Sequence, residues 1–212
     1  MKKVKFIVFI CLFILLPLAY FNGFIRISDL TSEQESIAKK YGGVYVFDEK
    51  LEKEIDKREE ERQIMTKGLS GKKLAENRYA VDMTPVNEKL PRVLTNGKRY
   101  YLRWIDYENE TGKEVKIPND YVEKIINYIG KENLEKYTPN LSMSYFYIDG
   151  DKVVPIRTSA SYLYRIKTFT LYGDEASGIK FSSSNLAAAK GGNRFEFINN
   201  KFEKVSTSDK DK

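Results

Sequence analysis

The chain has 212 residues, with 36 Lys and Arg against 30 Asp and Glu, one cysteine and no histidine. The lack of histidine excludes Ser-His-Asp and Cys-His catalysis and any His-ligated metal site. Removing Lys2, Lys3 and Lys5 leaves 33 basic against 30 acidic residues, so the charge does not indicate nucleic-acid binding. We expect no nucleic-acid partner, no cofactor and no metal.

An uncharged apolar run, Phe6–Ile25, follows the basic start 1–5. As a helix these 20 residues would be about 30 Å long, which is the thickness of a bilayer's hydrocarbon core. The lysines predict that residues 1–5 stay cytoplasmic. The sequence therefore predicts a single-pass transmembrane anchor over residues 6–25. The anchor residues would be Phe6, Ile7, Val8, Phe9, Ile10, Leu12, Phe13, Ile14, Leu15, Leu16 and Leu18.

A cleaved signal peptide is the alternative interpretation of this run. Pro17 favours it, because proline could end the apolar helix at Leu16. The stretch Leu18–Gly23 does not favour it, because bulky residues or proline occupy the positions that should be small. Either interpretation exports everything from Arg26 onward. The Lys-, Ile-, Asn- and Tyr-rich composition indicates a bacterium, so we predict a protein of the inner membrane with a periplasmic domain.

Residues 26–97 form a helical, charged region near the predicted membrane. Thr31 and Gln34 have capping-box spacing, which predicts a short helix to Lys40. A brief strand at Val44–Phe47 and a long helix over Asp48–Lys67 follow. This second helix is polar nearly all round, which is typical of a solvated surface helix; a spacer or a charged docking face is the functional alternative.

Residues 98–205 read as the β-rich part of an α+β domain. Lys98–Tyr107 predicts a strand that the loop Glu108–Gly112 returns as a hairpin. Asn119–Ile129 has an apolar stripe and predicts a helix that packs on the sheet, with a short second turn over Lys131–Tyr137.

The rest of the chain predicts antiparallel hairpins. The expected strands are Met143–Ile148, Lys152–Thr158, Ser161–Tyr172, Ile179–Phe181, Arg194–Ile198 and Lys201–Val205. Leu186–Gly192 predicts a helical turn or a loop, and residues 206–212 a disordered tail. The predicted fold class is thus α+β: a transmembrane helix, then one extracytoplasmic domain with an antiparallel sheet and one or two packed helices.

No motif for chemistry is specific. The Ser-x-x-Lys spacing at Ser70–Lys73 lacks its partner motifs, and a hairpin turn accounts for Asp149-Gly150-Asp151. Asp106, Glu108 and Glu110 lie at alternate positions, which could supply the carboxylate pair of a hydrolase acting on envelope glycan. A charged hairpin tip is the simpler interpretation.

From Asp151 on, eleven Lys and Arg stand against seven Asp and Glu and are interleaved with Tyr and Phe, as in an ordinary half-exposed sheet. They also suggest a surface for an acidic partner or for anionic lipid headgroups, and the candidate residues are Tyr101, Arg103, Tyr162, Tyr164, Arg165 and Lys167. The leading hypothesis is a protein-binding module of the envelope without catalysis, either a complex subunit or an immunity-like antagonist. The alternatives are the carboxylate hydrolase and a lipid or small-ligand carrier with an apolar cavity.

Overall fold

A computed structural model describes residues 2–75, 78–174, 176, 178–189 and 191–205. It confirms an α+β fold, but its main sheet is mixed rather than purely antiparallel. The strands are β1 (Asn22–Ser28), β2 (Gly43–Val46), β3 (Lys72–Ala75), β4 (Arg78–Ala80), β5 (Tyr100–Arg103), β6 (Asn140–Asp149), β7 (Lys152–Asp174), β8 (Gly178–Ala189), β9 (Asn193–Ile198) and β10 (Lys201–Val205).

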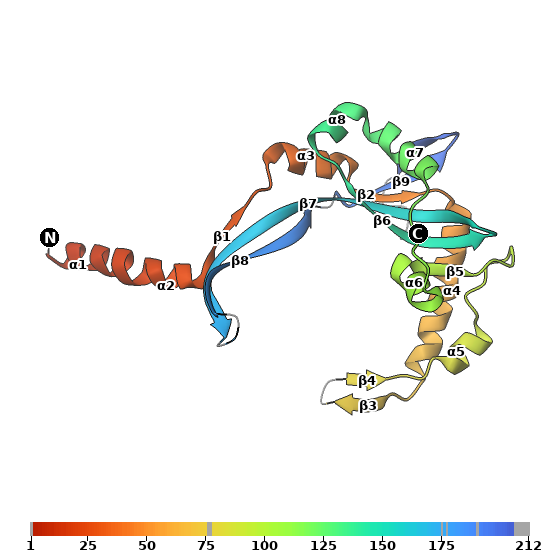
Figure 1. The fold of residues 1–212 in the computed structure, drawn as a ribbon, viewed down its shortest axis with the longest axis horizontal. Coiled ribbons are helices and arrows are strands. Elements are labelled where there is room, and N and C mark those ends of the chain that lie inside the picture. The colour runs from red at the N-terminus through yellow and green to blue at the C-terminus, as the bar shows by residue number, and fades with distance from the viewer. Residues whose placement is uncertain (1, 76–77, 175, 177, 190, 206–212) are drawn as a thin grey trace.

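The sheet is built around β7, which has 23 residues and is one continuous strand. Its first part lies in the core, where the strand order is β10-β9-β2-β7-β6-β5. Its second part pairs with β8 on one side and β1 on the other and leaves the core as a three-stranded extension. Figure 1 shows this extension reaching away from α4 and α7 and towards the N-terminal helices α1 and α2.

Helices cover both faces of the core sheet. They are α3 (Ser32–Tyr41), α4 (Glu49–Lys67), α5 (Thr84–Lys89), α6 (Trp104–Thr111), α7 (Asn119–Ile129) and α8 (Lys131–Lys136). In Figure 1, α3, α7 and α8 lie over one face and α4 under the other. The largest core cluster joins Ile125 and Ile129 of α7 to the buried rings of Tyr45, Phe195 and Phe202, so the predicted amphipathic helix does pack on the sheet.

The N-terminal segment corrects the prediction of a membrane anchor. It consists of α1 (Lys2–Ile10), a π-helical turn (Cys11–Leu15) and α2 (Leu16–Phe21). Proline lacks an N–H and its ring clashes with the carbonyl four residues earlier. The π turn ends at Leu15, two residues before Pro17. The helical path ends at Phe21, where the Asn22 side chain donates to the Leu18 carbonyl oxygen (2.8 Å) and β1 begins.

Among the residues that the structure describes, no helix is long and apolar enough to cross a membrane. The predicted anchor over residues 6–25 is therefore wrong, and the single-pass placement in the inner membrane, which rested on it, is withdrawn. The predicted anchor residues are Phe6, Ile7, Val8, Phe9, Ile10, Leu12, Phe13, Ile14, Leu15, Leu16 and Leu18. All of them are exposed except Ile10, which is half-buried.

Three further predictions differ from the structure. The predicted strand Lys98–Tyr107 stops at Arg103, and its second half is helix α6. The two strands predicted over 152–158 and 161–172 are one strand. The short strand and the helical turn predicted over 179–192 are mainly the single strand β8. The predicted tail, 206–212, lies outside the described residues.

Candidate functional site

The edge of β6 is only partly covered. On one side β6 pairs with β7 along its whole length, from Asn140 to Asp149. On the other side β5 pairs with it only from Tyr147 to Ser144, because the chain turns into α6 directly after Arg103. Among the described residues, no strand therefore pairs with the outer side of Asn140–Met143.

Backbone N–H and C=O groups of Asn140–Met143 point to the side of β6 that β5 does not cover. In an antiparallel strand, alternate residues direct both N–H and C=O to the same side, so about two of these four residues face away from β7. In the described part of the chain, no backbone hydrogen bond joins them to the connecting segment 113–118, which lies nearest. The stretch is thus an open sheet edge of the kind that pairs with another strand.

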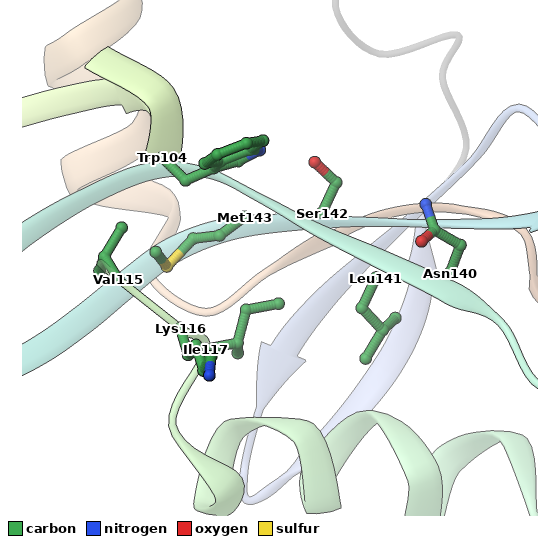
Figure 2. A pocket seen from close by; sticks show the side chains of 8 residues that line it. All are labelled: Trp104, Val115, Lys116, Ile117, Asn140, Leu141, Ser142 and Met143. Carbon is green, nitrogen blue, oxygen red and sulfur yellow. The ribbon is translucent and has the colours of Figure 1, made fainter. Parts of the chain in front are cut away.

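A groove of about 550 Å³ lies along this open edge. It is lined by Trp104, Val115, Lys116, Ile117, Asn140, Leu141, Ser142 and Met143. Figure 2 shows Trp104 and Ser142 on one side of β6, and Val115, Ile117 and Leu141 on the other. We call this site the β6 groove.

Five of the eight residues that line the β6 groove are apolar, and its walls are held in place. Met143 is 3% exposed and packs with Val115 and Phe146, whereas the Trp104 ring stays 42% exposed at the rim. The segment that carries Val115 is fixed because its backbone N–H donates to the Glu108 carboxylate (3.1 Å). The groove is therefore a preformed surface with an exposed aromatic ring beside an open strand edge.

Next to the groove, Tyr145 interrupts the regular strand. Its φ is 23°, which is rare for a residue with a side chain, and its hydroxyl donates to Asp56 of α4 (2.8 Å). On β7, the consecutive residues Ile156 and Arg157 both contact α4 side chains, so the alternation of a flat strand is broken here. Burial and the bond to Asp56 raise the pKa of Tyr145 to about 12.

A buried ionic centre holds α4 against the sheet on the face opposite α7. Both terminal nitrogens of Arg194 donate to the Glu52 carboxylate, one of them at 3.0 Å, and Arg157 approaches the same carboxylate at 3.5 Å. Arg194 also donates to Glu196 (2.8 Å). These bonds to Glu52, opposed by burial, raise the pKa of the Arg194 guanidinium above its usual value. Every member is engaged with another, so we interpret the centre as structural.

The predicted interaction residues fall into two separate places. Tyr101 and Arg103 lie on β5 beside the groove, where the Tyr101 ring stacks on Phe146 and Arg103 is bound to Asp106 (2.6 Å). The other four, Tyr162, Tyr164, Arg165 and Lys167, lie on the β7 extension. Tyr162 is buried against α3, whereas Arg165 and Lys167 are exposed.

The three candidate catalytic carboxylates do not converge. Asp106 is bound to Arg103, Glu108 accepts the Val115 N–H, and Glu110 is paired with Arg99 (2.7 Å). Within the described ranges, no group of three or more acidic or cysteine side chains is placed to hold a metal ion. Two neighbouring acids facing one substrate, as glycoside hydrolysis needs, are not formed by these three residues.

Sequence reasoning missed the β6 groove, because it placed Trp104 in the middle of a strand. A signal for the turn into α6 was present: Gly112, which adopts φ 69° after the helix, is the residue type that ends helices in the left-handed conformation. No local sequence pattern predicts the ion pair between Glu52 and Arg194, because the two residues are 142 positions apart.

Comparison with protein-family models, with curated proteins and with solved structures finds no match to this chain. The functional argument therefore rests on the geometry of the chain itself.

Proposed function

We propose that the protein is a protein-binding module without catalytic activity, and that it binds an extended segment of a partner protein in the β6 groove. The observation that carries the proposal is the open edge Asn140–Met143 inside an apolar groove. A strand added there would continue the line of β5 and pair its backbone with β6.

The groove indicates which segment would fit. Side chains of an added strand alternate between its two faces. One set would meet the apolar wall of Val115, Ile117 and Leu141, and the other set would lie beside the ring of Trp104. The preferred segment therefore has branched apolar residues at alternate positions, with a side chain between them that can cover an indole ring.

The test uses Trp104 as the reporter, because it is the chain's only tryptophan. Short synthetic peptides with valine or isoleucine at alternate positions are titrated against the full chain. We expect the tryptophan emission to shift to shorter wavelength as the ring becomes covered. A matched peptide with a central proline, which lacks the N–H that pairing needs, should bind about tenfold more weakly or not at all.

Two variants locate the site, with binding followed by fluorescence anisotropy of labelled peptide. Trp104→Ala should weaken binding about tenfold, because it removes one wall of the groove. Ile64→Ala, which truncates an exposed apolar residue on α4 away from the groove, should bind like the unaltered chain. Equal binding of the proline peptide, or no effect of Trp104→Ala, would refute strand addition at β6. Cleavage of the bound peptide would refute the absence of catalysis.

A further inference from the structure

The extension of β7 forms an arm, and Tyr20 of α2 packs against Phe169 near its far end (4.9 Å between ring centroids). We define the arm as β1, the part of β7 from Tyr162 to Asp174, and β8. At its base, α3 covers one face by packing Ile37 and Ala38 against Tyr162. Figure 1 shows the arm extending beyond α3 on the side away from α7. A three-stranded sheet normally buries an apolar face against another layer.

The face of the arm opposite Tyr162 carries exposed apolar residues. On β7, Leu163, Arg165 and Lys167 share this face because they alternate with Tyr162. The register places Leu186 of β8 opposite Arg165, and Ile27 of β1 opposite Lys167. Leu163 is 43% exposed, Ile27 58% and Leu186 68%. We call these five residues the arm face.

The arm face is also cationic. Arg165 and Lys167 are two residues apart on one strand, which places their Cα atoms about 7 Å apart. The Lys167 ammonium lies 5.1 Å from the centre of the Phe169 ring. In the described part of the chain, no carboxylate forms an ion pair with either side chain. The Asp29 carboxylate accepts the backbone N–H of Arg165 (2.6 Å), which ties β7 to the segment after β1.

We propose that the arm face binds an acidic amphipathic helix of another protein. Side chains at i and i+4 on a helix are about 6 Å apart, so two carboxylates at that spacing match the separation of Arg165 and Lys167. Leucines on the same face of the helix would cover Leu163, Ile27 and Leu186. A second copy of this chain does not fit, because a two-fold contact through this face would set the cations of one copy against those of the other.

A charge swap tests the proposal on the full chain. One synthetic helical peptide carries two glutamates at i and i+4 among leucines; its matched partner carries lysines at the same two positions. We expect the glutamate peptide to bind the unaltered chain. The double variant Arg165→Glu/Lys167→Glu should bind this peptide about tenfold more weakly and should bind the lysine peptide instead. Added salt should weaken both matched pairs.

Controls separate this surface from net charge and from the β6 groove. Lys57→Glu/Lys131→Glu changes the net charge equally at two exposed lysines off the arm and should leave binding unchanged. An equal loss in this control, or no reversal of preference in the arm variant, overturns the proposal. The unaltered chain could also self-associate. If the arm variant abolishes that self-association, the proposal is overturned in favour of a contact between copies.

The β6 groove is tested separately. The Trp104 emission measured with the groove peptides should be the same in all variants, so each proposal can fail alone.

Discussion

Glu52 is the residue on which the contact between α4 and the sheet depends. It is fully buried and faces the guanidinium groups of Arg194 and Arg157. A buried charge costs free energy unless a partner compensates it. Loss of the anion would leave two arginines facing each other with little access to water.

We therefore predict that Glu52→Gln lowers the free energy of unfolding by up to about 3–5 kcal/mol, because Arg157 loses its ion pair with Glu52 and Arg194 keeps only its bond to Glu196. Urea unfolding followed by circular dichroism measures this loss. Glu60→Gln, at an exposed position on the same helix, should change stability by less than about 0.5 kcal/mol. A loss for Glu52→Gln as small as that of Glu60→Gln would contradict the structural role of the centre.

Tyr162 is a second buried polar residue, but its hydroxyl has no hydrogen-bond partner among the described residues. Burial, with a smaller contribution from Tyr41, raises its pKa to about 12. The raised pKa means that the unfolded chain loses this proton first. The stability contributed by the neutral ring is complete below pH 10 and is lost as the pH rises from about 10 to about 12.

We predict that Tyr162→Phe keeps the fold and raises stability at neutral pH by about 1 kcal/mol, because it removes an unpaired buried hydroxyl. The variant should also lose less stability than the unaltered chain between pH 10 and pH 12. Thermal melts across this range give both quantities. A destabilised variant, or one with an unchanged alkaline slope, would indicate that the hydroxyl has a partner such as a bound water.

At the scale of elements, the sequence predicts α3, α4 and α7, but it predicts neither α6 nor the ends of several strands. Thr31 caps α3 through the Gln34 N–H (3.0 Å), as the capping-box spacing predicts. Helix α4 has the predicted extent, but its interpretation as a solvated helix missed the buried Glu52. Local sequence patterns predict helix caps and the apolar face of a helix. The burial of a charged residue such as Glu52 depends instead on partners far along the chain.

The groove illustrates the same limit. Residues 98–107 alternate like a strand, yet β5 ends at Arg103. The pattern is compatible with both forms, because Trp104 and Tyr107 also share a helix face at i and i+3. Side-chain packing favours the helix over the strand here, because Tyr107 contacts the Tyr101 and Phe146 rings when residues 104–111 form α6. That tertiary contact creates the open edge of β6, and no local pattern reports it.

For α4 itself we predict a measurable contribution from its cap. Asp48 accepts the Leu51 backbone N–H (2.9 Å), which satisfies one of the free donors at the start of the helix. Asp48→Ala should lower the free energy of unfolding by about 1 kcal/mol. Asp151→Ala, at an exposed turn between β6 and β7, is the matched control in urea unfolding and should have no comparable effect. Equal stability of the two variants would contradict the cap.

At the scale of the whole molecule, the chain exposes more surface than its size requires. Its accessible area is 15097 Å². A compact monomer of this length would expose about 10,000 Å². The excess agrees with Figure 1, where the N-terminal helices and the arm project from the core.

We predict that small-angle scattering of dilute protein gives a radius of gyration clearly above about 17 Å, the value for a compact chain of 212 residues. Dilution series provide the control, because self-association would make the value depend on concentration. A value near 17 Å that does not change on dilution would mean that the arm folds back on the core.

The unbroken course of β7 has a mechanical consequence. The strand has 23 residues, so it is about 75 Å long, and it pairs with β6 beside the groove before it becomes the centre of the arm. Since no loop separates the two parts, a partner that tilts the arm twists the ladder to which Asn140–Met143 belongs. If binding at the arm changes the twist of this strand, it should change the affinity of the β6 groove, and binding at the groove should change the affinity of the arm by the same factor.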